Sequence, residues 1–123
     1  MGTTVAAKAD REFSEDGDWE ECPPVEELDL SMILHALSDP MRLRIVAGLA
    51  TEGDMACKAF DLPIAKSTCA HHFRVLRESG LIRHRVVGTT RINSLRREEL
   101  DARFPGLIDA VLHGAHRMPD LLA

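Results

Sequence analysis

Residues 54–95 decide the fold, and they read DMACKAFDLPIAKSTCAHHFRVLRESGLIRHRVVGTTRINSL. Apolar spacing and turn residues predict a short helix, a turn that contains proline, a longer helix and two β-prone runs. In order, these elements are expected at residues 55–60, 61–64, 66–79, 81–87 and 90–95. Gly88 and Thr89 separate the two runs, where a tight hairpin needs a residue that tolerates positive φ. The order is that of a helix-turn-helix followed by a β-hairpin wing.

The expected helix at 66–79 has one apolar face. Cys69, Phe73 and Leu76 are spaced i, i+4 and i+7, which places their side chains on one side of a helix. Ser67 is the expected N-cap of this helix and Gly80 its expected C-cap. We therefore expect Cys69 to lie in the core, where a buried thiol behaves as a small apolar group.

The opposite face of this helix and the hairpin concentrate the positive charge of the chain. From Lys66 to Arg97 the sequence has eight Lys or Arg residues and a single acid, Glu78. The alternative is a solvated charged surface, but cations interleaved with short polar donors on a helix-turn-helix favour contact with double-stranded DNA. The candidate DNA-binding residues are Lys66, Ser67, Thr68, His71, His72, Arg74, Arg83, Arg85, Thr89 and Arg91.

Most of these candidates can be assigned either to DNA phosphates or to base edges. Phosphate contacts fix a protein on the duplex without reading its sequence, whereas base edges in the major groove carry the sequence information. The residues assigned to phosphates are Lys66, Arg83, Arg85 and Arg91. The residues assigned to base edges are Ser67, Thr68, His71 and Arg74. Among these, Arg74 can donate two hydrogen bonds to one guanine.

The net charge of −5 combines two parts of opposite sign. Residues 1–29 contain ten acids against two bases, whereas residues 30–123 contain thirteen Lys or Arg against ten acids. The expected organisation is a disordered acidic tail at 1–24, a winged helix-turn-helix and dimerisation domain at 25–118, and a C-terminal tail at 119–123. Trp19 stands out in the acidic tail, where docking on the body or on a partner is as well supported as an unattached side chain.

The flanking sequence predicts further helices, which complete a mainly α domain. One apolar helix is expected at about 25–37, and Asp39 and Pro40 then suit the N-cap and first residue of the next. Beyond the hairpin, a short helix at 98–103 precedes a final apolar helix that restarts at Pro105. The first and last helices are too apolar to stay exposed, so we expect them to pair in a two-fold homodimer.

Composition excludes several classes of protein. No apolar run reaches the roughly 18–20 residues of a membrane span, and no secretory signal is visible, so no membrane partner is expected. Three cysteines without paired spacing argue against a disulfide framework and make the cytoplasm the expected location. No nucleophile, base and orienting group occur as a set, so we do not expect an enzyme. The remaining alternative is a winged-helix module that binds proteins through its acidic tail, without sequence-specific DNA binding.

The segments LHALSDPMRLRIVAGL at 34–49 and KSTCAHHFRVLRESGLIRHRVVGTTRINSL at 66–95 resemble the ArsR family. This family contains the bacterial arsenic-repressor and metallothionein-repressor type of winged-helix regulators, and the resemblance covers roughly residues 28–112. It implies a homodimeric repressor, paired through its first and last helices, that leaves its operator on a metal, metalloid or redox signal. It also implies that Ser67, Thr68, His71 and Arg74 face the major groove.

The sequence departs from this family at the signal sites. Many members have paired cysteines where this chain has Cys57 alone, and another group has Asp-x-His where this chain has Asp101-x-Arg103. Two candidate sites remain. Cys22 and Cys57 are a candidate thiol sensor for a metalloid or an oxidant. Asp109, His113 and His116 share a helix face and are candidate ligands for a divalent transition metal such as zinc, nickel or cobalt, the alternative being a solvated polar face.

Overall fold

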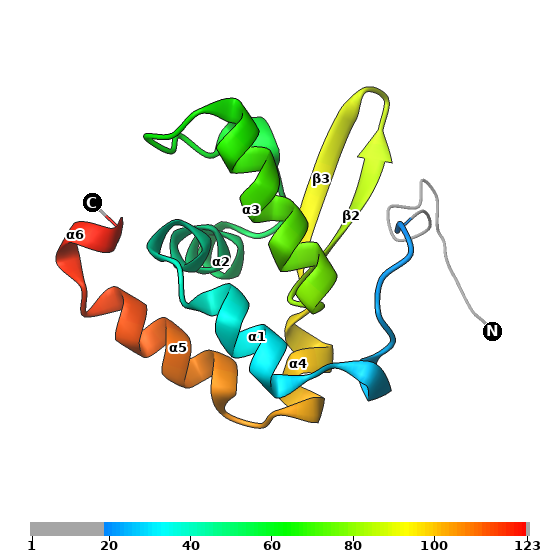
Figure 1. The fold of residues 1–123 in the computed structure, drawn as a ribbon, viewed down its shortest axis with the longest axis vertical. Helices are drawn as coiled ribbons and strands as arrows, with labels where there is room; N and C mark the ends of the chain where they lie inside the picture. The colour runs from blue at the N-terminus through cyan, green and yellow to red at the C-terminus, as the bar shows by residue number, and fades with distance from the viewer. Residues whose placement is uncertain (1–18, 123) are drawn as a thin grey trace.

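The computed structural model describes residues 19–122. Their elements, in chain order, are η1 (Val25–Glu27), α1 (Leu30–Leu37), α2 (Pro40–Glu52), β1 (Met55–Ala56), η2 (Cys57–Ala59), α3 (Lys66–Ser79), β2 (Ile82–Val87), β3 (Thr90–Leu95), α4 (Arg97–Arg103), α5 (Leu107–His116) and α6 (Pro119–Leu122). Figure 1 shows β2 and β3 projecting as a hairpin beside α3, while α1, α4 and α5 gather at the opposite end of the domain. The fold is a mainly helical winged helix-turn-helix, as the sequence predicts.

The small sheet has three antiparallel strands in the order β1-β3-β2. The hairpin pairs Ile82 with Leu95 at its base and Val87 with Thr90 at its tip. Only Gly88 and Thr89 connect the strands, and Gly88 has a φ of 65°, a conformation that glycine adopts without strain. Both strands of the predicted wing are therefore confirmed within one residue.

One apolar core joins the helices to the sheet. Phe73 and Leu76 of α3 are fully buried, and the ring of Phe73 meets that of Phe60 edge to face at a centroid distance of 5.6 Å. The other large apolar side chains that are fully buried in this core come from α1, α2, β2, α4, α5 and the residue before β2, and are Ile33, Ile45, Val46, Leu81, Ile82, Leu100 and Ile108. The recognition helix α3 is thus fixed by the apolar face that its spacing predicts.

The predicted first helix at about 25–37 is confirmed only from Leu30 onward, because the chain is interrupted at Asp29. This residue is extended, with φ −108° and ψ 121°, and its carboxylate accepts a hydrogen bond from the amide of Met32. Its side chain therefore caps α1, which separates this helix from the single 3-10 turn η1. The next boundary agrees with expectation, since the Asp39 carboxylate accepts from the amides of Met41 and Arg42 at the start of α2.

The predicted helix at 55–60 is wrong. Met55 and Ala56 form β1, which pairs with Asn93 and Ile92 of β3, and Cys57–Ala59 form only a 3-10 turn. Pairing with a strand that lies far along the chain overrides the local helical preference of this short segment. Cys57 consequently does not lie at the N-terminus of a full helix, where a helix dipole would act on its thiol.

Helix α3 has the predicted bounds but not the predicted N-cap. Ala65 occupies the cap position without a side-chain bond, and Ser67 is already inside the helix. Gly80 ends the helix as predicted, with a φ of 89°. A Cβ atom on Gly80 would lie 2.2 Å from Leu28 Cδ2, so the close approach also requires glycine.

The residues expected to form a C-terminal tail instead continue the fold. Pro119–Leu122 form α6, and Leu121 is 93% buried because α6 packs on α2. Within residues 19–122, no helix combines the length and apolar character that a membrane span needs.

Candidate nucleic-acid interface

The exposed face of α3 carries hydroxyl, imidazole and cationic side chains. The exposed residues among the candidates on this helix are Lys66, Ser67, Thr68, His71 and Arg74. Arg74 Nη2 lies 3.4 Å from His71 Nδ1, one helical turn away, so these two side chains are held near each other. The first acid on the helix is Glu78, so the first three turns present donors and cations without a carboxylate.

His72 belongs to the interior, which corrects its assignment to the DNA-facing side. The residue is 8% exposed, and its Nδ1 lies 3.1 Å from Nη1 of Arg42, which is also 8% exposed. Arg42 Nε donates to the Ala36 carbonyl at 2.7 Å, and His72 Nε2 lies 3.9 Å from the Asp39 carboxylate. His72 therefore links α3 to the junction of α1 and α2, and sequence spacing alone gave no signal of this partner.

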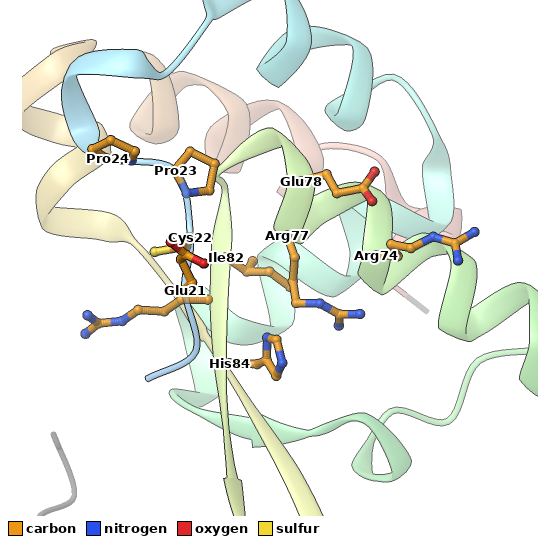
Figure 2. Close-up of a pocket in the computed structure, with 10 residues that line it drawn as sticks. Glu21, Cys22, Pro23, Pro24, Arg74, Arg77, Glu78, Ile82 and His84 are labelled. Atoms are coloured by element: carbon orange, nitrogen blue, oxygen red, sulfur yellow. The ribbon is translucent and has the colours of Figure 1, made fainter. Parts of the chain in front are cut away.

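The arginines of the wing lie on opposite faces of the hairpin. Directly paired residues in an antiparallel ladder share a face, and successive residues alternate. Arg91 pairs with Val86 and therefore lies on the same face as His84, whereas Arg83 and Arg85 lie on the other. Figure 2 shows His84 and Ile82 on the side of β2 that faces α3. Arg91 thus lies on the face of the hairpin next to α3, and lines a cavity together with Lys66 of that helix. Arg83 and Arg85, on the other face, form the outer arginine pair.

Positive charges are crowded between α3 and the hairpin. Burial lowers the pKa of Arg77, and the neighbouring Arg91 lowers it further. The pKa of His84 is likewise lowered by burial and then by the charges of Arg77 and Arg91. Repulsion among these groups means that a bound anion would be favoured here.

Trp19 docks on the outer arginine pair. The guanidinium carbons of Arg83 and Arg85 lie 4.1 and 5.0 Å from the centre of the Trp19 ring. Trp19 forms an antiparallel bridge with Arg85, and the next amide, that of Glu20, donates to the His84 carbonyl at 2.7 Å. The sequence left open whether Trp19 docks or stays unattached, and in the structure it is docked on the wing.

The N-terminal segment continues along β2 after Trp19. Figure 2 shows Glu21 and Cys22 beside this strand, with Pro23 and Pro24 leading the chain away from it. A cavity of about 520 Å³ lies between the segment, β2 and α3, and Arg74 and Arg77 line its other side. The acidic segment therefore adjoins the recognition helix as well as the wing.

The candidate thiols are not brought to one place. Cys22 lines the cavity beside β2, whereas Cys57 lines a second cavity of about 470 Å³ between η2, α3 and β3. The thiol that shares this second cavity is Cys69, whose pKa is raised by burial and then by the charge of Cys57. Asn93 Nδ2 donates to Cys57 Sγ at 3.1 Å. The sequence did not predict that Asn93 lies beside Cys57, because residues 55–60 were expected to form a helix. In the structure Met55 and Ala56 form β1, which pairs with β3.

The candidate metal ligands on α5 are engaged separately. Asp109 is bonded to Arg97 of α4, and His116 Nδ1 lies 2.8 Å from the Leu112 carbonyl, while His113 is exposed. Within residues 19–122, no group of three or more His, Cys, Asp or Glu side chains is arranged so that it could hold a metal ion. Within the described residues, these three side chains therefore do not converge on one point.

The first helix leaves apolar side chains exposed at the end of the domain away from the wing. Leu30, Met32 and Leu34 are 44%, 51% and 47% exposed, respectively. Figure 1 shows α1 at the end of the domain away from the tip of the hairpin. Three large apolar side chains on one short helix are more than isolated surface residues, and mark a surface suited to a protein partner.

Comparison with known proteins agrees with this geometry. A family model for a helix-turn-helix domain matches residues 37–85. The uncharacterized HTH-type transcriptional regulator YceK of Bacillus subtilis is 33% identical over 84 residues, which are 66% of this chain and 84% of that protein. A crystal structure of an ArsR family transcriptional regulator superposes with a TM-score of 0.53 at 27% identity, covering 74% of this chain and 96% of that one. The chain belongs to the ArsR family of winged helix-turn-helix transcription regulators.

A further relative is a transcriptional repressor SmtB homolog of Synechocystis. It is 34% identical over 71 residues, which are 54% of each chain. In this ArsR-family regulator, α3 is the second helix of the motif and β2 and β3 form its wing. DNA binding and transcription regulation follow from the family.

Proposed function

We propose that this ArsR-family regulator is a homodimeric repressor that binds a duplex operator through the exposed side of α3 and the wing. The observation that carries the proposal is the run of exposed donors and cations on α3, with no acid before Glu78. Arg91 extends this surface onto the adjoining face of the hairpin. A surface of this kind matches the phosphates and base edges of a major groove.

The proposed contacts follow from exposure and position. Ser67, Thr68, His71 and Arg74 project from one side of α3 and are assigned to base edges, and Lys66 and Arg91 to phosphates. Thr89 at the hairpin tip can donate to a phosphate from its hydroxyl. Arg83 and Arg85 keep their phosphate assignment, provided that Trp19 leaves them.

Replacing Arg74 by alanine tests the base-reading assignment. The variant should lose about 1–3 kcal/mol of discrimination, because a bidentate contact to guanine is removed while the other contacts remain. Duplexes selected from a random pool by the parent protein supply the specific ligand, and a scrambled duplex supplies the reference. Arg103→Ala removes a cation that lies over Phe104 at the end of α4, and should leave the ratio unchanged. An equal loss on both duplexes would reassign Arg74 to the backbone.

The proposal of a homodimer is supported by α1. Its exposed Leu30, Met32 and Leu34 have no cover within the described chain, and a two-fold partner would remove them from water. A dimer would also present two copies of α3 to two half-sites of an operator, as helix-turn-helix regulators require for tight binding.

We infer that the release signal acts at Cys57. Its thiol lines the 470 Å³ cavity together with Cys69, so a soft metalloid or an oxidant that enters meets two thiols beside α3. Cys22 lies in a different cavity, so its part in a thiol site would depend on a second subunit. The site of Asp109, His113 and His116 would likewise need ligands from a symmetry mate, and Asp109 would have to leave Arg97.

Three variants separate these signals. Cys57→Ser is expected to remain bound to operator DNA when arsenite or hydrogen peroxide is added, because the reacting thiol is gone. Cys22→Ser should respond like the parent, and so should the double variant His113→Ala/His116→Ala. Zinc, nickel and cobalt, titrated against the same variants under reducing conditions, test the metal site. Release of Cys57→Ser by arsenite, or loss of a metal response only in the histidine variant, would contradict the thiol assignment. Fluorescence anisotropy of a labelled operator measures each case.

A further inference from the structure

We propose that the outer face of the wing is a docking surface for an aromatic and acidic strand, and that residues Trp19–Cys22 occupy it in competition with DNA. These four residues are called the latch below. The inference rests on the proposed DNA-binding function, because the competition concerns Arg83 and Arg85. The docking itself is observed in the structure and does not depend on DNA.

The aromatic part of the surface is the outer arginine pair. The two guanidinium groups lie 4.1 and 5.0 Å from the centre of one indole ring, and both arginine side chains are partly buried. Indole is the ring that attracts cations most strongly, and each such contact strengthens as it is removed from water. The Trp19 ring restrains both guanidinium groups, so moving them toward phosphates on the duplex costs these cation–π contacts.

The backbone part of the surface is the free edge of β2. In the order β1-β3-β2, this strand lies at one edge of the sheet formed by the described strands. The bridge between Trp19 and Arg85, with the bond from Glu20 N to His84 O, places the latch along that edge as a short added strand. This is the mode in which extended peptides bind sheet edges, where main-chain bonds give affinity and alternate side chains give specificity.

The acidic residues of the latch lie beside the surface that is proposed to bind DNA. Glu21 lines the 520 Å³ cavity opposite Arg74 and Arg77, and Glu20 is exposed one residue away. Figure 2 shows Glu21 beside β2, with Arg74 and Arg77 across from it on α3. These carboxylates repel phosphates and partly neutralise the cations that would bind them. The docked latch therefore opposes DNA binding both at the outer arginine pair and at the recognition helix.

Competition between the latch and DNA predicts how the apparent DNA affinity depends on docking of the latch. If DNA binds well only to the undocked chain, its apparent affinity is reduced by the fraction of molecules in which the latch is undocked. Weakening the latch must then raise DNA affinity, although it removes no DNA contact and adds none. A latch that instead positions Arg83 and Arg85 for phosphates would give the opposite sign.

Trp19 reports its own docking, because it is the single tryptophan of the chain. Without DNA, acrylamide should quench its fluorescence weakly in the parent and more strongly in Arg83→Gln/Arg85→Gln, which removes both cations. Adding a short duplex of mixed sequence at low salt should raise the quenching of the parent toward that of the double variant. Quenching that is equally strong in parent and double variant would show that the latch does not dock, and would overturn the inference.

Binding of the same duplex tests the sign of the effect. Trp19→Ala is expected to bind about fivefold more tightly or better, since two cation–π contacts are lost only from the docked state. Trp19→Phe retains a ring and should fall between Trp19→Ala and the parent. Glu20→Gln/Glu21→Gln should also bind more tightly, whereas the matched control Glu26→Gln/Glu27→Gln, which removes the same charge at η1, should change binding less. Unchanged or weaker binding by Trp19→Ala would overturn the inference.

The two proposals fail in different ways. If neither the parent nor Trp19→Ala binds any duplex, the proposed DNA-binding function fails, and competition with DNA fails with it. If the parent binds DNA while its Trp19 stays as protected as in the free chain, the DNA-binding function stands and the competition is overturned.

Discussion

The variant Leu34→Glu is expected to be a monomer that has lost specific DNA binding. Leu34 is 47% exposed on α1, so a glutamate there remains solvated in one chain and should change its stability by less than about 0.5 kcal/mol. In the proposed dimer the same carboxylate would be buried against apolar side chains, which is costly without a partner. Separated subunits read one half-site each, so the specific component of binding, typically about 10³-fold or more over non-specific binding, should disappear.

Sedimentation at several protein concentrations measures the assembly, and a duplex with two half-sites measures the binding. Val87→Glu is the matched control, since it places the same charge at a residue that is 46% exposed at the far end of the wing. That control should sediment like the parent. A dimer that survives Leu34→Glu would exclude this part of α1 from the interface.

Glu99→Gln is expected to destabilise the domain by about 2 kcal/mol at pH 7. Arg96 Nε and Nη2 donate to the two oxygens of Glu99 at 2.9 and 3.2 Å, and the Arg96 side chain is only 1% exposed. Glutamine keeps one acceptor oxygen but removes the charge and one of these two bonds, and the further bond of the buried cation is a long one, 3.4 Å, to the Gly80 carbonyl. Breaking a fully buried pair costs about 3–5 kcal/mol, and the figure is reduced here because Glu99 is 41% exposed.

The same pair gives a dependence on pH with a definite sign. The hydrogen bond from Arg96 lowers the pKa of Glu99 below its usual 4.5. Its stabilising contribution is therefore fully present above that value, and is lost as the pH falls through the lower pKa of the folded state. The free energy of unfolding should fall more steeply with acidification in the parent than in Glu99→Gln. Urea titrations at neutral and acidic pH measure this, with Glu98→Gln, an exposed neighbour, as control. Parallel pH profiles for parent and Glu99→Gln would contradict the assignment.

The elements predicted correctly are those specified by nearby residues. The period of Cys69, Phe73 and Leu76, with Gly80 after them, defines α3 without reference to the rest of the chain. The hairpin is equally local, because its two strands are joined by only two residues. Since the exposed side of α3 is fixed once its buried side is known, most of the proposed base-reading surface could be predicted as well.

Apart from the start of the first helix and the N-cap of α3, the main errors involve partners that lie far apart in the sequence. Met55 forms a strand rather than a helix because it pairs with Asn93, 38 residues later. His72 is buried because Arg42, 30 residues earlier, reaches its ring. The isolated position of Trp19 among acidic residues indicated that it could dock, but the sequence did not identify Arg83 and Arg85 as the residues that it contacts. Local patterns contain no information about such contacts, so the neighbours of Cys57 and the latch could not be predicted.

The contact at Gly80 limits how a signal can reach DNA. Leu28 lies so close to Gly80 that no side chain fits between them, and Arg96 bonds to the Gly80 carbonyl from the start of α4. The C-terminal end of α3 therefore packs against the segment before α1 and is bonded to the segment after the wing, so a movement of α3 alone would disturb both contacts. In the proposed dimer, a release signal is therefore expected to rotate whole subunits, which changes the spacing and angle between the two copies of α3. Small rotations at the α1 surface would then become larger displacements at the wing tips, because the hairpin projects at the other end of the domain (Figure 1).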